Sequence, residues 1–193
     1  AWDWGHLYLQ ALPQHQPLIG HTGEIVAISP SNDGQHVVTS SWDGTAIVWD
    51  SNSGLPVLKL INSETSHKSD VEYSAFSPDD KYVLTASSDG LLRVWPFIPG
   101  KTMQMAQETF KLGQKAIRCL TFSPDGNFLI TCDDLGAIKV WDWEKKNFTQ
   151  PISENWHRKG IRCTKAMFSP DGSVMVSCGW TQTPIIWKLT RDG

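Results

Sequence analysis

The chain lacks any long run of apolar residues. No stretch approaches the roughly 18 residues that a membrane-spanning helix requires, and no basic segment followed by an apolar one opens the sequence as a secretory leader would. Of its 193 residues, 40% are hydrophobic and 19% are charged, a balance that excludes disordered and collagen-like chains. We therefore expect a soluble globular protein that does not enter a membrane.

Signatures of the common enzyme classes are also missing. The sequence contains no GxGxxG, GxxxxGK[ST], HExxH or GxSxG segment, so none of the mechanisms tied to these motifs is indicated. The cysteines show no CxxC spacing of the kind found in structural zinc sites; they are Cys119, Cys132, Cys163 and Cys178. Each lies in an apolar stretch, which favours buried, reduced thiols and a cytoplasmic location. We expect no catalytic residue, no metal site and no cofactor.

Basic residues are scarce in the first half of the chain. Residues 1–90 contain three Lys and no Arg against eleven acidic residues, whereas residues 91–193 contain fourteen basic and nine acidic ones. Neither half has a block of five like charges, so the difference is either variation among solvated positions or a dipolar surface that steers partners.

What the sequence does have is a period of 46 residues. Four tryptophans recur at this spacing, Trp49, Trp95, Trp141 and Trp187. A Phe-Ser-Pro-Asp segment starts at Phe76, Phe122 and Phe168, again 46 residues apart. A period of this length indicates a repeat architecture in which each unit packs on the next.

Each unit consists of short apolar runs separated by turn residues. In the second unit we expect strands over 71–76, 82–86 and 91–95, with turns at 77–80 and 88–90. A fourth run follows the first and second units, at 55–61 and at 103–112, and the latter could equally form a short helix. Four antiparallel strands in 46 residues predict an all-β protein built of propeller blades.

These units resemble WD40 repeats, which open with Gly-His, carry an Asp in a tight turn and close with Trp-Asp. Gly20-His21 and Trp49-Asp50 bracket the first unit, and Trp141-Asp142 closes the third. The resemblance implies one β-propeller segment over 1–193, with repeats at 20–50, 67–95, 113–142 and 157–188. Residues 1–12 would form the end of a preceding repeat and its outer strand.

The resemblance also implies a buried network of His, Ser or Thr, Asp and Trp in each complete blade. The first two units offer both sets, His21, Thr39, Asp43, Trp49 and His67, Thr85, Asp89, Trp95. In the third and fourth units Gly113 and Lys159 stand in place of the His, and Leu135 and Thr181 in place of the Asp. A local bulge could bring in Asp134, which lies one residue before its register.

In this family, partners bind mainly on one face of the propeller. Three registers should reach that face, and the side chains there that suit partner binding are Trp42, Trp180, Glu24, Asp70, Glu72, Arg118, Asp134 and Arg162. Exposed tryptophans among charges have the composition of an interface hot spot. The alternative is that the two tryptophans only cover blade edges. We expect a non-catalytic scaffold or regulatory module for a protein or peptide partner.

Two other functions and three architectures stay open. Basic and aromatic residues interleave over 156–165, as in nucleic-acid interfaces, although the pI of about 6.1 argues against nucleic-acid binding. The other alternative is a propeller that regulates a catalytic domain outside this chain. Rings of this family have about seven or eight blades. The four units would therefore be part of a longer chain, pair with a second copy into an eight-bladed homodimer, or close alone.

Overall fold

The computed structural model describes residues 17–61, 69–101, 106–145, 148, 151, 153–156 and 160–188. All regular elements within these residues are β-strands, and none of the described residues forms a helix long and apolar enough to cross a membrane. The fifteen strands are β1 (Ile25–Pro30), β2 (His36–Ser41), β3 (Thr45–Asp50), β4 (Pro56–Ile61), β5 (Val71–Phe76), β6 (Tyr82–Ser87), β7 (Leu91–Pro96), β8 (Glu108–Lys111), β9 (Ile117–Phe122), β10 (Phe128–Asp133), β11 (Ala137–Asp142), β12 (Ser153–Trp156), β13 (Cys163–Phe168), β14 (Val174–Gly179) and β15 (Ile185–Lys188).

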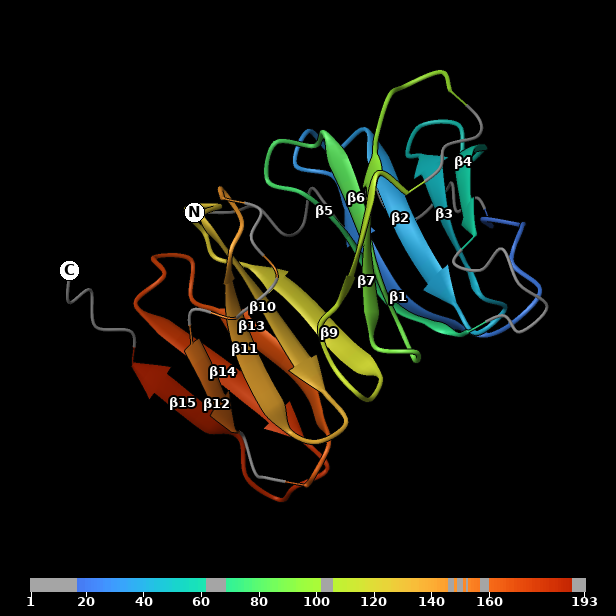
Figure 1. Ribbon diagram of the computed structural model, residues 1–193. Helices are drawn as coiled ribbons and strands as arrows, with labels where there is room; N and C mark the ends of the chain where they lie inside the picture. The colour runs from blue at the N-terminus through green and yellow to red at the C-terminus, as the bar shows by residue number, and fades with distance from the viewer. Residues whose placement is uncertain are drawn as a thin grey trace, which may run out of the picture.

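The strands form four antiparallel sheets, in agreement with the all-β blades expected. Blades 1, 2 and 3 each contain four consecutive strands, β1–β4, β5–β8 and β9–β12, and the described part of blade 4 contains β13–β15. The first strands of neighbouring blades pack together, β1 with β5, β5 with β9 and β9 with β13. Among the described residues β13 does not pack on β1 in this way, so the blades form an open arc (Figure 1).

Local sequence explains the turns between the first two strands of each blade. In blade 2, Ser77 Oγ donates to Asp79 Oδ1 at 2.6 Å and accepts from the Tyr82 amide at 3.0 Å. The same Ser-to-Asp bond recurs in the other blades, which explains the 46-residue spacing of these aspartates. The predicted strands of the second unit are confirmed, and the segment expected as either strand or helix contributes β8.

The hydrophobic core lies between the blades rather than within one of them. Val38 and Val48 of blade 1 pack with Val71 and Val83 of blade 2. Separate clusters fill the junctions between blades 2 and 3 and between blades 3 and 4. Each blade is therefore stabilised by its neighbours, as expected for a repeat architecture.

Blade 4, at one end of the arc, exposes registers that are buried in blade 1. Val176 and Ile186 of blade 4 are 39% and 67% exposed. Val38 and Val48, which hold the same registers in blade 1, are fully buried. A second copy would cover such surfaces, and the eight-bladed homodimer stays a prediction.

Candidate functional site

The four residues of the first predicted network lie together in blade 1. His21 Nδ1 is 3.0 Å from Asp43 Oδ2, and His21 Nε2 is 2.8 Å from Thr39 Oγ1. The Trp49 indole donates to Thr39 Oγ1 at 2.8 Å. Gly20 has no side chain here because a Cβ atom would lie 2.8 Å from the Trp49 ring. The Gly-His and Trp-Asp ends of the repeat are thus joined through one buried hydroxyl.

Asp43 is the one acid of this network. Its side chain is 6% exposed, and burial alone would raise its pKa. Hydrogen bonds from the Thr45 hydroxyl, the Thr22 amide and His21 outweigh burial and hold the pKa of Asp43 well below its usual value. The carboxylate therefore fastens the turn between β2 and β3 to the segment that precedes β1.

In blade 2 the structure shows only part of the second network. The Trp95 indole donates to Thr85 Oγ1 at 2.9 Å, while His67 lies outside the described residues. Asp89 accepts hydrogen bonds from the Ser87 hydroxyl and from Arg93 Nη2, the latter at 3.3 Å. The arginine at this register has no counterpart in blade 1, where Ile47 stands in its place.

Blades 3 and 4 keep half of the network. Trp141 donates to Thr131 at 2.9 Å and Trp187 to Ser177 at 2.8 Å, so the indole-to-hydroxyl bond occurs in all four blades.

An acid that the sequence reasoning missed takes over the turn of blade 3. Asp133 Oδ1 accepts from the amides of Leu135 and Ala137, at 2.9 and 3.0 Å. Burial raises its pKa, and these two hydrogen bonds offset only part of that rise. The Asp134 side chain does not take the turn position as the bulge hypothesis suggested. The signal that could have identified Asp133 is its position in the repeat, because it occupies the register of Ser41 in the first blade and Ser87 in the second.

One end of the blades carries the registers expected on the binding face. In every blade a backbone amide at this end donates to the carbonyl of the residue 18 positions earlier. Examples are the Trp42 amide with the Glu24 carbonyl and the Trp180 amide with the Arg162 carbonyl, both at 3.1 Å. The first strand of every blade also has a bulge at this end, and the inserted residue is Glu72 in blade 2 and Arg118 in blade 3. Bulges redirect side chains and often lie next to functional sites.

Six of the eight predicted partner-binding residues form one continuous chain across the four blades. It begins at Trp42, whose indole donates to Glu72 Oε2 in a long bond of 3.4 Å. Glu72 forms an ion pair with Arg118, and Arg118 binds Asp134 through two hydrogen bonds of 2.7 and 2.9 Å.

The chain continues into blade 4. Asp134 is 2.5 Å from Arg162 Nε, and the Arg162 guanidinium lies 4.4 Å from the centre of the Trp180 ring. We call Trp42, Glu72, Arg118, Asp134, Arg162 and Trp180 the face chain. A guanidinium at this distance attracts the face of an indole, so the charged chain also orients the tryptophan at its far end.

The charges within the face chain neutralise one another. The side chain of Glu72 is 7% exposed and that of Arg118 is 18% exposed. Although burial raises the pKa of Asp134, hydrogen bonds and attraction from Arg118 and Arg162 lower it more strongly. Hydrogen bonding to Asp134 raises the pKa of Arg118. These four groups are thus held by each other, and the tryptophans at the two ends remain 48% and 72% exposed.

The other two predicted residues, Glu24 and Asp70, differ from the face chain. Both lie beside the face chain, Glu24 in blade 1 and Asp70 in blade 2, because their backbone carbonyls accept from the amides of Trp42 and Ser88. Among the described residues neither carboxylate makes a hydrogen bond or ion pair, and Glu24 is exposed. Their carboxylates place two acidic groups beside the face chain in blades 1 and 2.

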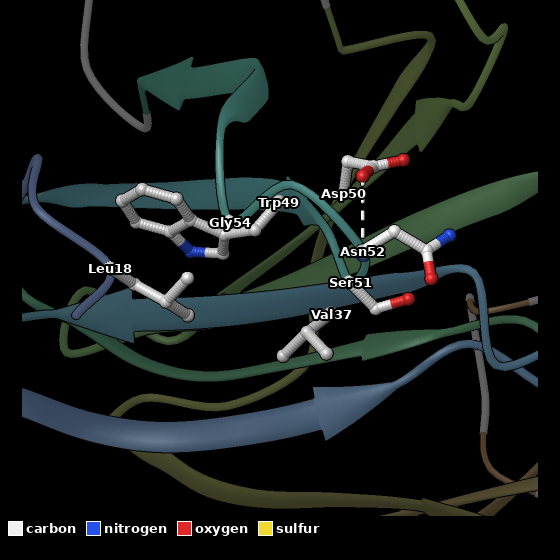
Figure 2. Close-up of a pocket in the computed structure, with 7 residues that line it drawn as sticks. All are labelled: Leu18, Val37, Trp49, Asp50, Ser51, Asn52 and Gly54. Carbon is white, nitrogen blue, oxygen red and sulfur yellow. Dashed lines mark hydrogen bonds between the residues drawn. The ribbon is translucent and has the colours of Figure 1, made fainter. Parts of the chain in front are cut away.

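A hollow of about 260 Å³ lies elsewhere, on the side of blade 1 (Figure 2). It is lined by Leu18, Val37, Trp49, Asp50, Ser51, Asn52 and Gly54. Its one carboxylate, Asp50, accepts from the amides of Asn52 and Ser53 and so serves its own turn. The described part of the chain also has no group of three or more His, Cys, Asp or Glu arranged to hold a metal ion.

The basic segment 156–165 has two described basic residues, Arg162 and Lys165, and Lys165 is exposed. Arg162 is bound to Asp134 and Trp180. Residues 157–159 lie outside the described residues. Nucleic-acid binding through this segment stays a prediction.

The chain matches the family model of the WD domain, G-beta repeat (WD40). The family model matches residues 13–50, 58–96, 106–142 and 150–188, and so accounts for most of the chain. Each matched segment ends within or directly after the third strand of a blade. The match and the four sheets therefore describe the same repeat.

Proposed function

Because the chain belongs to the WD40-repeat family, whose members generally serve as scaffolds for protein partners, we propose that it binds an extended peptide segment across the face chain. The observation that carries the proposal is the continuous chain itself, which joins four blades and ends in two exposed tryptophans. Large exposed aromatic side chains beside arginine are typical of interface hot spots.

The ion pairs support this function by fixing the tryptophans in advance. The Trp42 indole N–H donates to Glu72, and the Arg162 guanidinium lies over the Trp180 ring. Side chains that are already ordered lose little conformational entropy when a partner binds. The carboxylates of Glu24 and Asp70 would favour a basic residue in the part of the peptide over blades 1 and 2.

The test uses peptides selected from a random displayed library against the 193-residue chain. Trp42→Ala and Trp180→Ala should each weaken binding of these peptides at least tenfold, about 1.4 kcal/mol. Leu55→Ala is the matched control, because Leu55 is 65% exposed but lies in a turn away from the face chain, and it should change binding less than twofold.

Two results would reject the proposal. Unchanged affinity in both tryptophan variants would place binding elsewhere on the molecule. Loss of the folded state, seen as loss of the cooperative unfolding transition in urea, would instead mean that the tryptophans cover blade edges.

A further inference from the structure

Three buried thiols meet at the junction of blades 3 and 4. Cys119 on β9 and Cys132 on β10 are each 1% exposed, and Cys163 at the start of β13 is fully buried. All three belong to the hydrophobic cluster that joins the two blades. Cys119 and Cys132 are also direct partners in the register of β9 and β10. Opposed residues of an antiparallel pair have Cα atoms about 4.5 or 5.5 Å apart, which is within the range that a disulfide spans.

The hydrogen bonds around these thiols give them different acidities. The neighbouring sulfurs of Cys119 and Cys163, together with burial, raise the pKa of the Cys132 thiol. The Cys119 sulfur accepts from the Ala166 amide at 3.3 Å and its thiol donates to the Ala166 carbonyl at 3.7 Å. The neighbouring Cys132 and the Ala166 amide lower the pKa of Cys119. The pKa of Cys163 is lowered as well, but Cys119 is the residue that faces Cys132 across the paired strands. Since the thiolate is the nucleophile, the strand register makes Cys119 the attacking sulfur and Cys132 the neighbour placed to follow.

The thiols lie directly below the face chain. Cys119 follows Arg118 in the sequence, Cys132 lies two residues before Asp134, and Cys163 follows Arg162. The bond between Arg118 and Asp134 joins the start of β9 to the end of β10. Cys119 and Cys132 face each other on the same two strands, next to this bond. A covalent bond at the cysteine pair would therefore constrain the strand ends that present the face chain.

We propose that Cys119 and Cys132 are a redox modification site, which a peroxide converts to a reversible disulfide within blade 3. The Cys119 thiolate attacks one oxygen of hydrogen peroxide, the O–O bond breaks, and hydroxide leaves to give a sulfenic acid. The sulfur of Cys132 then attacks the Cys119 sulfur, the S–O bond breaks, and the released hydroxide takes the Cys132 proton. Two thiols and one peroxide become one disulfide and two water molecules, and a dithiol reductant reverses the change.

The test uses the full chain with Cys178→Ser, which removes the one exposed thiol. The protein is treated with hydrogen peroxide and then unfolded in denaturant, free thiols are blocked there with an alkylating agent, and the chain is digested with trypsin. Cleavage after Arg118 and Lys139 leaves Cys119 and Cys132 together in the peptide 119–139, whereas Cys163 falls in the peptide 163–165. We expect the peptide 119–139 to be lighter by two hydrogen atoms and unalkylated, with the peptide 163–165 alkylated, and dithiothreitol to restore both thiols.

Three results would overturn the proposal. The first is a link between peptides 119–139 and 163–165, and the second is oxidation of single sulfurs without a bond. The third is full alkylation of all three buried cysteines after a treatment that oxidises Cys178 in the unchanged protein. Cys163→Ser is the matched control, because it removes a neighbouring thiol and should still allow the Cys119–Cys132 bond.

Discussion

Replacing Arg118 with Met tests whether the face chain contributes to stability. The change removes the central charge and keeps a side chain of similar length. Asp134 would keep Arg162 at 2.5 Å. Glu72, whose side chain is 7% exposed, would keep only the long bond of 3.4 Å from Trp42. The cost therefore falls on Glu72, which becomes a nearly buried carboxylate without a cation.

The expected magnitude follows from this partial burial. Removing one partner of a fully buried ion pair costs about 3–5 kcal/mol, and exposed pairs contribute about 0–1 kcal/mol. Because Arg118 itself is 18% exposed and the pair is only partly screened by solvent, we expect a loss of about 2 kcal/mol in the free energy of unfolding. For a chain of this length that lowers Tm by about 4–8 °C.

The assay is equilibrium unfolding in urea at neutral pH, with the m-value compared between variants. Lys81→Met is the control, because the Lys81–Asp79 pair is 3.3 Å long with side chains 74% and 46% exposed, and it should cost at most about 0.5 kcal/mol. Adding Glu72→Gln to Arg118→Met should recover part of the loss, since it removes the uncompensated charge. A loss below about 0.5 kcal/mol for Arg118→Met, or a double variant no better than the sum of both changes, would refute the reasoning.

Three further predictions concern single carboxylates. Asp43→Asn should cost about 1–3 kcal/mol at neutral pH. Its folded pKa is lowered, so the stability it supplies is present above about pH 4 and is lost as pH falls through the folded value. Asp133→Asn should cost less, because the folded pKa of Asp133 is raised. Ionisation of Asp133 then removes stability as pH rises from about 4 through its folded pKa. Urea unfolding of both Asn variants between pH 3 and 7 checks these predictions, and equal losses of stability at every pH would contradict them. Asp80 has a left-handed backbone with φ of 54° and accepts from the Asn32 and Asp33 amides of blade 1, at 2.9 and 3.0 Å. Asp80→Gly should therefore destabilise less than Asp80→Ala, because both lose these bonds and only glycine relieves the strain. An Asp80→Ala protein at least as stable as Asp80→Gly in urea unfolding would contradict this.

Much of the fold could be read from the period of the sequence. Alternating apolar residues and Ser-Pro-Asp turns act over a few residues, so they place strands such as β5 and β6 without reference to the rest of the chain. The repeated Trp and hydroxyl registers likewise predict the bond seen between Trp95 and Thr85. The positions on the face could be predicted for the same reason, because residues one period apart occupy equivalent places in successive blades.

The pairing of the face residues was accessible only from the tertiary structure. Glu72 and Arg118 are 46 residues apart and meet because bulges in two neighbouring blades turn both side chains toward the same junction. The sequence likewise did not decide between Asp133 and Asp134, since the direction of each side chain depends on where β10 leaves its register with β9. By itself the sequence determined a repeating all-β unit and the positions on its face. Packing between the blades decided which charges neutralise each other and which side chains, above all Trp42 and Trp180, stay exposed.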